Sequence, residues 1–193
     1  MTYPATFTLD APEKMARWRP LVHWLLAIPH LIILYVFGIV AQLMAVIAWF
    51  VIVITAKLPA GLSKVLVAYS RYNTRVVSYV LFLHDVYPAF DFSDANEDPG
   101  GSPVAVSYEP ALEDRNRLTV LLRLIWAIPA YLFFVVVYIV ASIVWTVGFF
   151  AVIILGRWPQ WMITFISGVM RCGTRFEAYL LLLTDEYPPF SLD

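Results

Sequence analysis

Charged residues are scarce in this 193-residue sequence, and two long stretches contain none. Only 14% of the residues are Asp, Glu, Lys or Arg, whereas ordinary soluble domains contain about 25%. Residues 20–56 and 124–156 have no charged residue, and 61% of the whole chain is hydrophobic. A domain this small cannot enclose so much apolar surface in its core. The sequence therefore predicts an integral membrane protein.

Residues that commonly perform chemistry are also few. The single cysteine, Cys172, excludes an internal disulfide and a cysteine-rich metal site. The three histidines each have a different residue type a hundred positions later (Arg123, Ala130 and Thr184), and a metal site needs three or four convergent ligands. No nucleotide-binding or Ser–His–Asp motif is present. We therefore expect no enzyme activity, no metal and no cofactor.

The basic residues flank the two uncharged runs and predict the topology. They fall in four clusters, within residues 14–19, 57–75, 115–123 and 157–175. The positive-inside tendency places both flanks of each run in the cytoplasm, which requires an even number of crossings per run. Asp10 and Glu13 occupy the place of a signal peptide's basic and apolar regions, so we expect an uncleaved signal-anchor. The prediction is a multi-pass protein of the inner (plasma) membrane with cytoplasmic termini and linker. A net charge of −1 gives no reason to expect nucleic acid.

The length of the runs leaves two alternatives open. About 20 helical residues cross the hydrocarbon core, so each run is long for one helix and barely long enough for two. The first alternative is a helical hairpin with turns near Gly38–Gln42 and Tyr138–Ser142. The second is one long helix kinked at Pro29 or Pro129, with residues 60–83 and 160–183 making the return pass. The hairpin is our prediction, because the return helix would place Arg71 and Arg75 near mid-membrane unless they are paired.

The chain contains one unit twice, at an ungapped offset of 100 residues. Ala27-Ile28-Pro29 recurs at 127–129, and residues 71, 74 and 75 (Arg, Thr, Arg) recur at 171, 174 and 175. This divides the chain into an N-terminal segment (1–16), a first repeat (17–90), an acidic linker (91–116) and a second repeat (117–193). Because equivalent basic residues flank both copies, we expect parallel repeats of one orientation. The first half of the linker is expected to be a mobile loop, and residues 104–108 an extended stretch that matches residues 5–9.

Several of these motifs together resemble a known family. They are the stretch Trp24–His30, Trp49–Ile52, a Lys/Arg-x-Pro step, the Thr-Arg pair and a closing Leu-x-Asp-x-Tyr-Pro-x-Phe. The chain is thereby similar to the bacterial membrane family catalogued as domain of unknown function 4389, in two tandem copies. The resemblance implies a duplicated multi-pass protein, often actinobacterial, and it implies no activity or catalytic residue.

Two sets of residues are candidates for a role. Residues 60–82 and their repeat have helical apolar periodicity with cations on the opposite face, which predicts an amphipathic interfacial helix after each run. Its cations are candidate contacts for anionic lipid headgroups or an acidic partner: Lys64, Arg71, Arg75, Arg171 and Arg175. The second set is expected to be structural, with Asp85 paired to Arg75 and Asp185 to Arg175: Pro29, Pro129, Asp85, Tyr87, Pro88, Asp185, Tyr187 and Pro188.

Three functions are compatible with the sequence. The first expectation is a non-catalytic accessory or scaffold subunit of a larger membrane complex, bound to other subunits or to its own copies. The second is a small transporter or channel component, although few polar residues interrupt the runs. The third is a lipid-binding or membrane-shaping protein that inserts into one leaflet.

Overall fold

The computed structural model describes residues 3–94, 98 and 101–193. In chain order the elements are β1 (Ala5–Leu9), α1 (Arg19–Thr55), α2 (Ala60–Val80), β2 (Val104–Tyr108), α3 (Arg117–Leu121), α4 (Arg123–Leu155) and α5 (Gln160–Leu180). Each half of the chain contributes a strand, a long helix and a shorter helix. The duplication and the extended stretch at residues 104–108 are confirmed. The uncharged runs and the helices after them predict an all-α protein, and the structure corrects this to a mostly helical one, because β1 and β2 form a two-stranded sheet.

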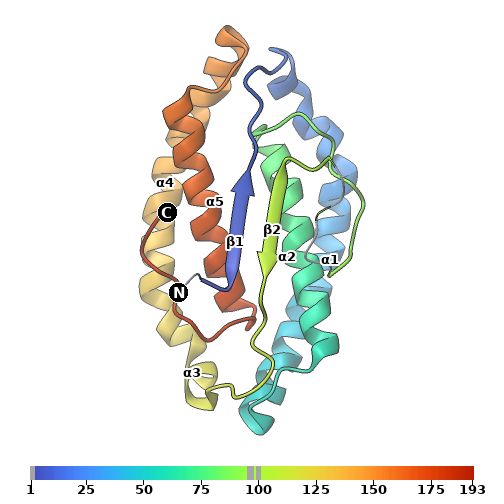
Figure 1. The fold of residues 1–193 in the computed structure, drawn as a ribbon, viewed down its shortest axis with the longest axis vertical. Helices are drawn as coiled ribbons and strands as arrows, with labels where there is room; N and C mark the ends of the chain where they lie inside the picture. The colour runs from blue at the N-terminus through green and yellow to red at the C-terminus, as the bar shows by residue number, and fades with distance from the viewer. Residues whose placement is uncertain (1–2, 95–97, 99–100) are drawn as a thin grey trace.

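The two long helices are continuous, so the predicted hairpins are wrong. α1 and α4 run unbroken through Gly38–Gln42 and Tyr138–Ser142. A glycine inside a helix costs only about 1 kcal/mol, which does not suffice to turn an apolar run back on itself. α1 ends because Ala56 takes the left-handed conformation (φ 58°), and α4 ends at Gly156 in the same conformation (φ 69°). Pro59 and Pro159 then precede the shorter helices, which run back along the long ones, as in the second alternative (Figure 1).

The elements form three layers (Figure 1). Strands β1 and β2 pair antiparallel and pack on α5 and α2 respectively. Helices α2 and α5 form the middle layer, and α1 and α4 pack against them from the other side. In the described part of the chain, α1 and α4 are the two helices long and apolar enough to cross a membrane, where four crossings were expected.

The two halves are related by a pseudo-twofold axis perpendicular to the sheet. The strand register is symmetric about the Phe7–Val106 pair. Along the sheet, α1 and α4 run in opposite directions, and so do α2 and α5 (Figure 1). The expected bundle of four crossings is therefore not formed, because each uncharged run is a single helix. The expected common orientation of the two repeats relative to a membrane stays a prediction.

The middle helices are not interfacial, which corrects a second expectation. The largest buried side chains of α2 include Arg71, Tyr72 and Tyr79, each less than 2% exposed. The strands pack on one side of α2 and α5, where Arg71 donates to the Val106 carbonyl at 2.9 Å, and the long helices pack on the other side (Figure 1). The amphipathic pattern therefore describes a helix between two layers instead of one between water and lipid.

Each long helix packs on its neighbour through a narrow stripe that includes small residues, and one difference between the repeats there is matched by a second one. Ala48 and Leu58 are both buried in the first half. Their equivalents are Gly148 and Trp158, and a Cβ atom added to Gly148 would lie 2.0 Å from the Trp158 ring. The larger side chain of Trp158 is thus matched by the smaller Gly148 on the long helix, which keeps both interfaces close-packed.

Candidate functional site

The outer face of α1 and α4 is a broad apolar surface. Among the described residues, most of the large exposed hydrophobic side chains lie on these two helices, with Tyr35 73% and Leu124 78% exposed. Both helices are free of charge beyond their first residues, Arg19 and Arg123. Monomeric soluble proteins rarely expose contiguous apolar patches larger than a few hundred Å². We call this surface the α1/α4 face.

The opposite side of the molecule is polar. The outward face of the sheet exposes Thr6, whose hydroxyl hydrogen-bonds the Ser107 hydroxyl at 2.6 Å. The buried positions of the same strands, such as Phe7 and Val106, point toward α2 and α5. Ion pairs link the linker to the helices on this side, and Lys64 pairs there with Asp94 at 3.6 Å, both exposed.

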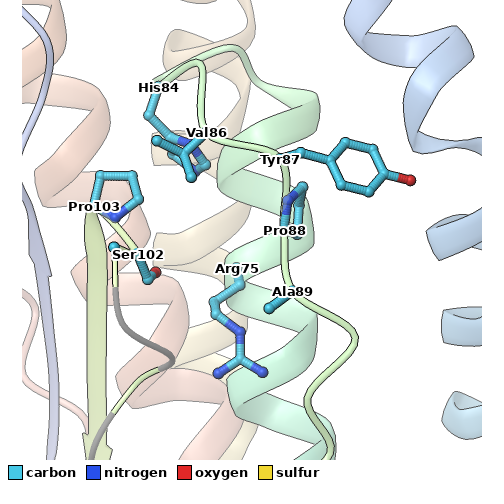
Figure 2. A pocket seen from close by; sticks show the side chains of 9 residues that line it. Arg75, His84, Val86, Tyr87, Pro88, Ala89, Ser102 and Pro103 are labelled. Atoms are coloured by element: carbon cyan, nitrogen blue, oxygen red, sulfur yellow. The ribbon is translucent and has the colours of Figure 1, made fainter.

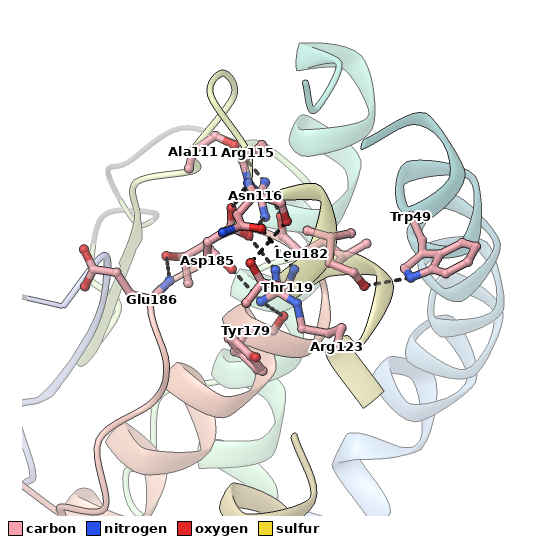
Figure 3. A network of polar contacts seen from close by, with 12 residues as sticks. Trp49, Ala111, Arg115, Asn116, Thr119, Arg123, Tyr179, Leu182, Asp185 and Glu186 are labelled. Carbon is pink, nitrogen blue, oxygen red and sulfur yellow. Dashed lines mark hydrogen bonds and ion pairs between the residues drawn. The ribbon is translucent and has the colours of Figure 1, made fainter. Parts of the chain in front are cut away.

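Asp185 organises the principal charge cluster of the second repeat (Figure 3). Its carboxylate accepts hydrogen bonds from Arg115 Nη2 at 2.7 Å, Arg123 Nη2 at 2.6 Å and the Asn116 backbone N–H at 3.0 Å. The Arg115 and Arg123 side chains are 0% and 2% exposed. Burial raises the pKa of Asp185, but the hydrogen bonds and charges of the arginines outweigh it and hold the pKa below its ordinary value.

The same motif is weaker in the first repeat. Asp85 lies 4.0 Å from Arg19 Nη2 and is 40% exposed, and His23 occupies the place of Arg123. The expected partners of both aspartates were therefore wrong. Arg75 instead pairs with Asp98 and Arg175 donates to the Asp193 carbonyl, whereas each aspartate contacts an arginine at the start of the long helix of its own repeat.

Arg71 and Arg75 are buried and share one carboxylate. Asp98 Oδ1 accepts from Arg71 Nη2 at 3.0 Å and from Arg75 Nη1 at 2.9 Å, and Oδ2 accepts the Val106 N–H at 2.8 Å. With 0% and 3% of their side chains exposed, the arginines present no surface to a lipid headgroup. Asp98 belongs to the stretch that was expected to be a mobile loop, yet it fixes β2 to α2. Residues 95–97 and 99–100 of that stretch lie outside the described residues.

Arg75 also borders a small cleft of about 50 Å³ (Figure 2). His84 and Pro88 line it from the segment that follows α2, and Ser102 and Pro103 from the segment before β2. Burial, together with the neighbouring His23, lowers the pKa of His84 to about 4. The cleft is too small to hold more than a water-sized molecule.

Arg171 and Arg175 hold the C-terminal segment. Arg171 Nε donates to the Leu192 carbonyl at 3.2 Å, and Arg175 Nη2 donates to the Asp193 carbonyl. The second pair of arginines thus binds backbone oxygens where the first pair binds Asp98. Cys172 is buried beside them.

The tyrosines of the closing motif contact the long helices beside their prolines. Tyr87 points from the cleft toward α1 (Figure 2), and its hydroxyl donates to the Leu26 carbonyl at 3.3 Å. In the second repeat, Tyr187 accepts the Ala130 N–H at 3.0 Å. Because proline has no N–H, Pro29 and Pro129 each remove one backbone hydrogen bond from their long helix. The tyrosines bind the backbone group one residue further along the helix, which is the Leu26 carbonyl in α1 and the Ala130 N–H in α4.

Comparison with known proteins agrees with this repeated construction. A family model described as a domain of unknown function (DUF4389) matches residues 17–91 and again residues 117–191. The chain belongs to this family. No curated protein and no solved structure matches it. The two DUF4389 units both contain the proline–tyrosine contact and the closing aspartate, while Arg115 and Asp98, which complete the charge clusters, lie in the linker outside both units. The partners of Arg115 and Asp98 could not be assigned from a comparison of the repeats, because both residues lie outside the two matched units.

Proposed function

We propose that this DUF4389 protein is a non-catalytic membrane protein that lies flat in one leaflet and binds lipid through the α1/α4 face. The observation that carries the proposal is the separation of the two sides of the molecule. Exposed apolar side chains gather on α1 and α4, while the sheet and the ion pairs lie on the opposite side. In-plane amphipathic elements of this kind bury their apolar face about 5–10 Å into the headgroup and acyl boundary.

The shape of the molecule supports a flat position over an upright one. A helix of 37 residues is about 55 Å long, well beyond the roughly 30 Å hydrocarbon core. The strands lie alongside the middle of the helices (Figure 1), so an upright molecule would hold a two-stranded sheet with two open edges inside the hydrocarbon. Open sheet edges in lipid leave backbone groups unpaired, at a cost of several kcal/mol each.

Two exposed basic residues connect the helices to the linker. Lys57 and Lys64 pair with Glu113 and Asp94, which belong to the linker. The linker and both termini share the sheet side of the molecule (Figure 1). By the positive-inside tendency we assign this side to the cytoplasm and the α1/α4 face to the inner leaflet of the plasma membrane. The accessory-subunit and transporter functions stay predictions, to be tested by co-purification and by flux measurements.

A depth measurement tests the proposal. An environment-sensitive fluorophore is attached to single cysteines at Leu25, Ile39 and Ile54, all exposed on α1, in a Cys172→Ala background. Quenching by lipids labelled at defined chain depths should place the three probes at a similar depth. An upright helix would instead place residue 39 deep, with residues 25 and 54 shallow. A probe at Thr6 on the outer sheet face serves as the control, which water-soluble quenchers alone should reach.

A further inference from the structure

A cavity of about 690 Å³ opens between the two long helices. α1 and α4 make few contacts with each other, and the cavity occupies the gap that they leave above α2 and α5. Its walls are mainly apolar and include Ile166, Val169 and Trp145. Its size lies within the range of about 300–1,000 Å³ that is typical of small-molecule sites.

The mouth of the cavity gathers polar residues that are otherwise rare in the long helices. Gln42 on α1 and Ser142 and Thr146 on α4 are exposed at this gap. They are the uncharged polar side chains of the central parts of both runs. Because the mouth lies between α1 and α4, a molecule entering from the α1/α4 face passes these side chains first.

Among the described residues that line the cavity, one is acidic and none is basic. Glu177 on α5 accepts a hydrogen bond from Asn73 Nδ2 on α2 at 3.3 Å, and both residues line the cavity. Desolvation raises the pKa of Glu177 to about 7, against the opposite influence of Asn73 and Ser70. Glu177 is not paired with the neighbouring Arg171 or Arg175, because these arginines donate to the C-terminal carbonyls instead.

The cavity lies on the pseudo-twofold axis, yet its polar floor is asymmetric. Thr74 and Thr174 both line it, as do Leu81 and Leu181. At the floor, however, the position equivalent to Glu177 is Val77, and the position equivalent to Asn73 is Gly173. A purely structural cavity would need no carboxyl group, and burying one costs free energy unless a partner satisfies it.

We propose that this cavity binds a single-chain amphiphile whose headgroup donates hydrogen bonds and carries no negative charge. The alkyl chain lies along the apolar walls toward the mouth, and the hydroxyl or amine group reaches Glu177 and Asn73. A phosphate or carboxylate headgroup is disfavoured at this floor, because it would meet Glu177 without a cation to compensate either charge. The inference rests on the proposed function, since the α1/α4 face brings the cavity mouth to the lipid.

Binding of defined probes to the purified full-length protein in nanodiscs tests this site. Monoolein and oleylamine are the expected ligands, and oleate, with the same chain and an anionic headgroup, is the comparison. At a pH of about 8, where Glu177 with its pKa of about 7 is mostly ionised, Glu177→Val installs the residue of the first repeat and should weaken monoolein binding by about tenfold or more, as expected for the loss of one hydrogen bond to a charged group. Glu186→Gln, which removes an exposed carboxylate outside the cavity, should leave binding unchanged.

The outcomes separate the two proposals. Lipid-depth measurements on Glu177→Val should match wild type, because the variant leaves the α1/α4 face intact. If the depth profile is flat and oleate binds as well as monoolein, or Glu177→Val binds monoolein like wild type, the ligand assignment is wrong and the membrane position stands. If the wild-type probes show the depth profile of an upright helix, the proposed flat position in the membrane is wrong, whatever the binding measurements give. A diazirine-labelled monoacylglycerol should crosslink to cavity residues in the wild type, and crosslinks confined to Leu25 or Ile54 would overturn the site.

Discussion

Replacement of Asp185 by Asn should destabilise the protein far more than the same change at Asp85. Asp185 faces two arginines that are almost fully buried, with contacts of 2.6–2.9 Å, and its own side chain is 24% exposed. Removal of one partner from a buried ion cluster costs about 3–5 kcal/mol, and the partial exposure places Asp185→Asn near the lower end. Asp85 lies 4.0 Å from Arg19 and is 40% exposed, so Asp85→Asn should cost at most about 1 kcal/mol.

Thermal unfolding in mild detergent, followed by tryptophan fluorescence, measures both variants. For a chain of this length about 1 kcal/mol corresponds to a Tm change of 2–4 °C. Asp185→Asn should therefore lower the Tm by about 6–12 °C, and Asp85→Asn by less than about 4 °C. Equal shifts in the two variants would refute the reasoning, because burial of the two arginines would then have no energetic consequence.

The pH dependence of Asp185 provides a second readout. Its pKa in the folded protein lies below the ordinary value, so its contribution to stability is complete at neutral pH. As pH falls below about 4, the carboxylate becomes protonated and that contribution is lost. Wild type should therefore lose its advantage over Asp185→Asn on acidification, and a constant difference between pH 7 and pH 3 would contradict the assignment.

Two further predictions use differences between the repeats. Gly148→Ala forces a Cβ atom against the Trp158 ring, so it should cost about 1–3 kcal/mol of unfolding free energy, and the added change Trp158→Leu, which recreates the pair of the first repeat, should recover part of it in thermal melts. Recovery by an unrelated cavity-forming change elsewhere would argue against this contact. His84 has a pKa lowered to about 4, so the unfolded chain takes up a proton first and stability should fall as pH drops from about 6.5 to 4. His84→Thr, the residue of the second repeat, should flatten that slope in a pH series of melts, and an unchanged slope would locate the titration elsewhere.

Some features of this protein follow directly from its sequence. The absence of charge from residues 20–56 and 124–156 predicts two long apolar helices, and the shared offset predicts that they are built alike. The alternation of residues 104–108 predicts a strand that matches residues 5–9. Helix length and strand alternation depend on residues that are close together in the sequence, so the sequence pattern is enough to predict them.

Other features depend on contacts between distant segments. The amphipathic pattern of residues 60–82 predicts a polar face and an apolar face, but it does not say whether water or a strand covers Arg71. The carboxylate that pairs with Arg71 and Arg75 comes from Asp98, which lies outside both repeats. Glu177 and Asn73 belong to different repeats and meet only because the twofold axis brings α2 against α5.

The crossing of the strands bears on the origin of the duplication. β1 precedes the first repeat but packs on α5 of the second, and β2 precedes the second repeat but packs on α2 of the first. A half-length chain of one strand and two helices would leave its strand without a partner and its shorter helix uncovered. Two such chains that exchange strands across a true twofold axis would give each strand a partner and cover both shorter helices. The present protein thus has the arrangement of a domain-swapped homodimer whose two subunits are joined by the segment between Phe90 and β2. Once fused, the two subunits could diverge, and a carboxyl group could be added on one side of their shared axis without appearing on the other.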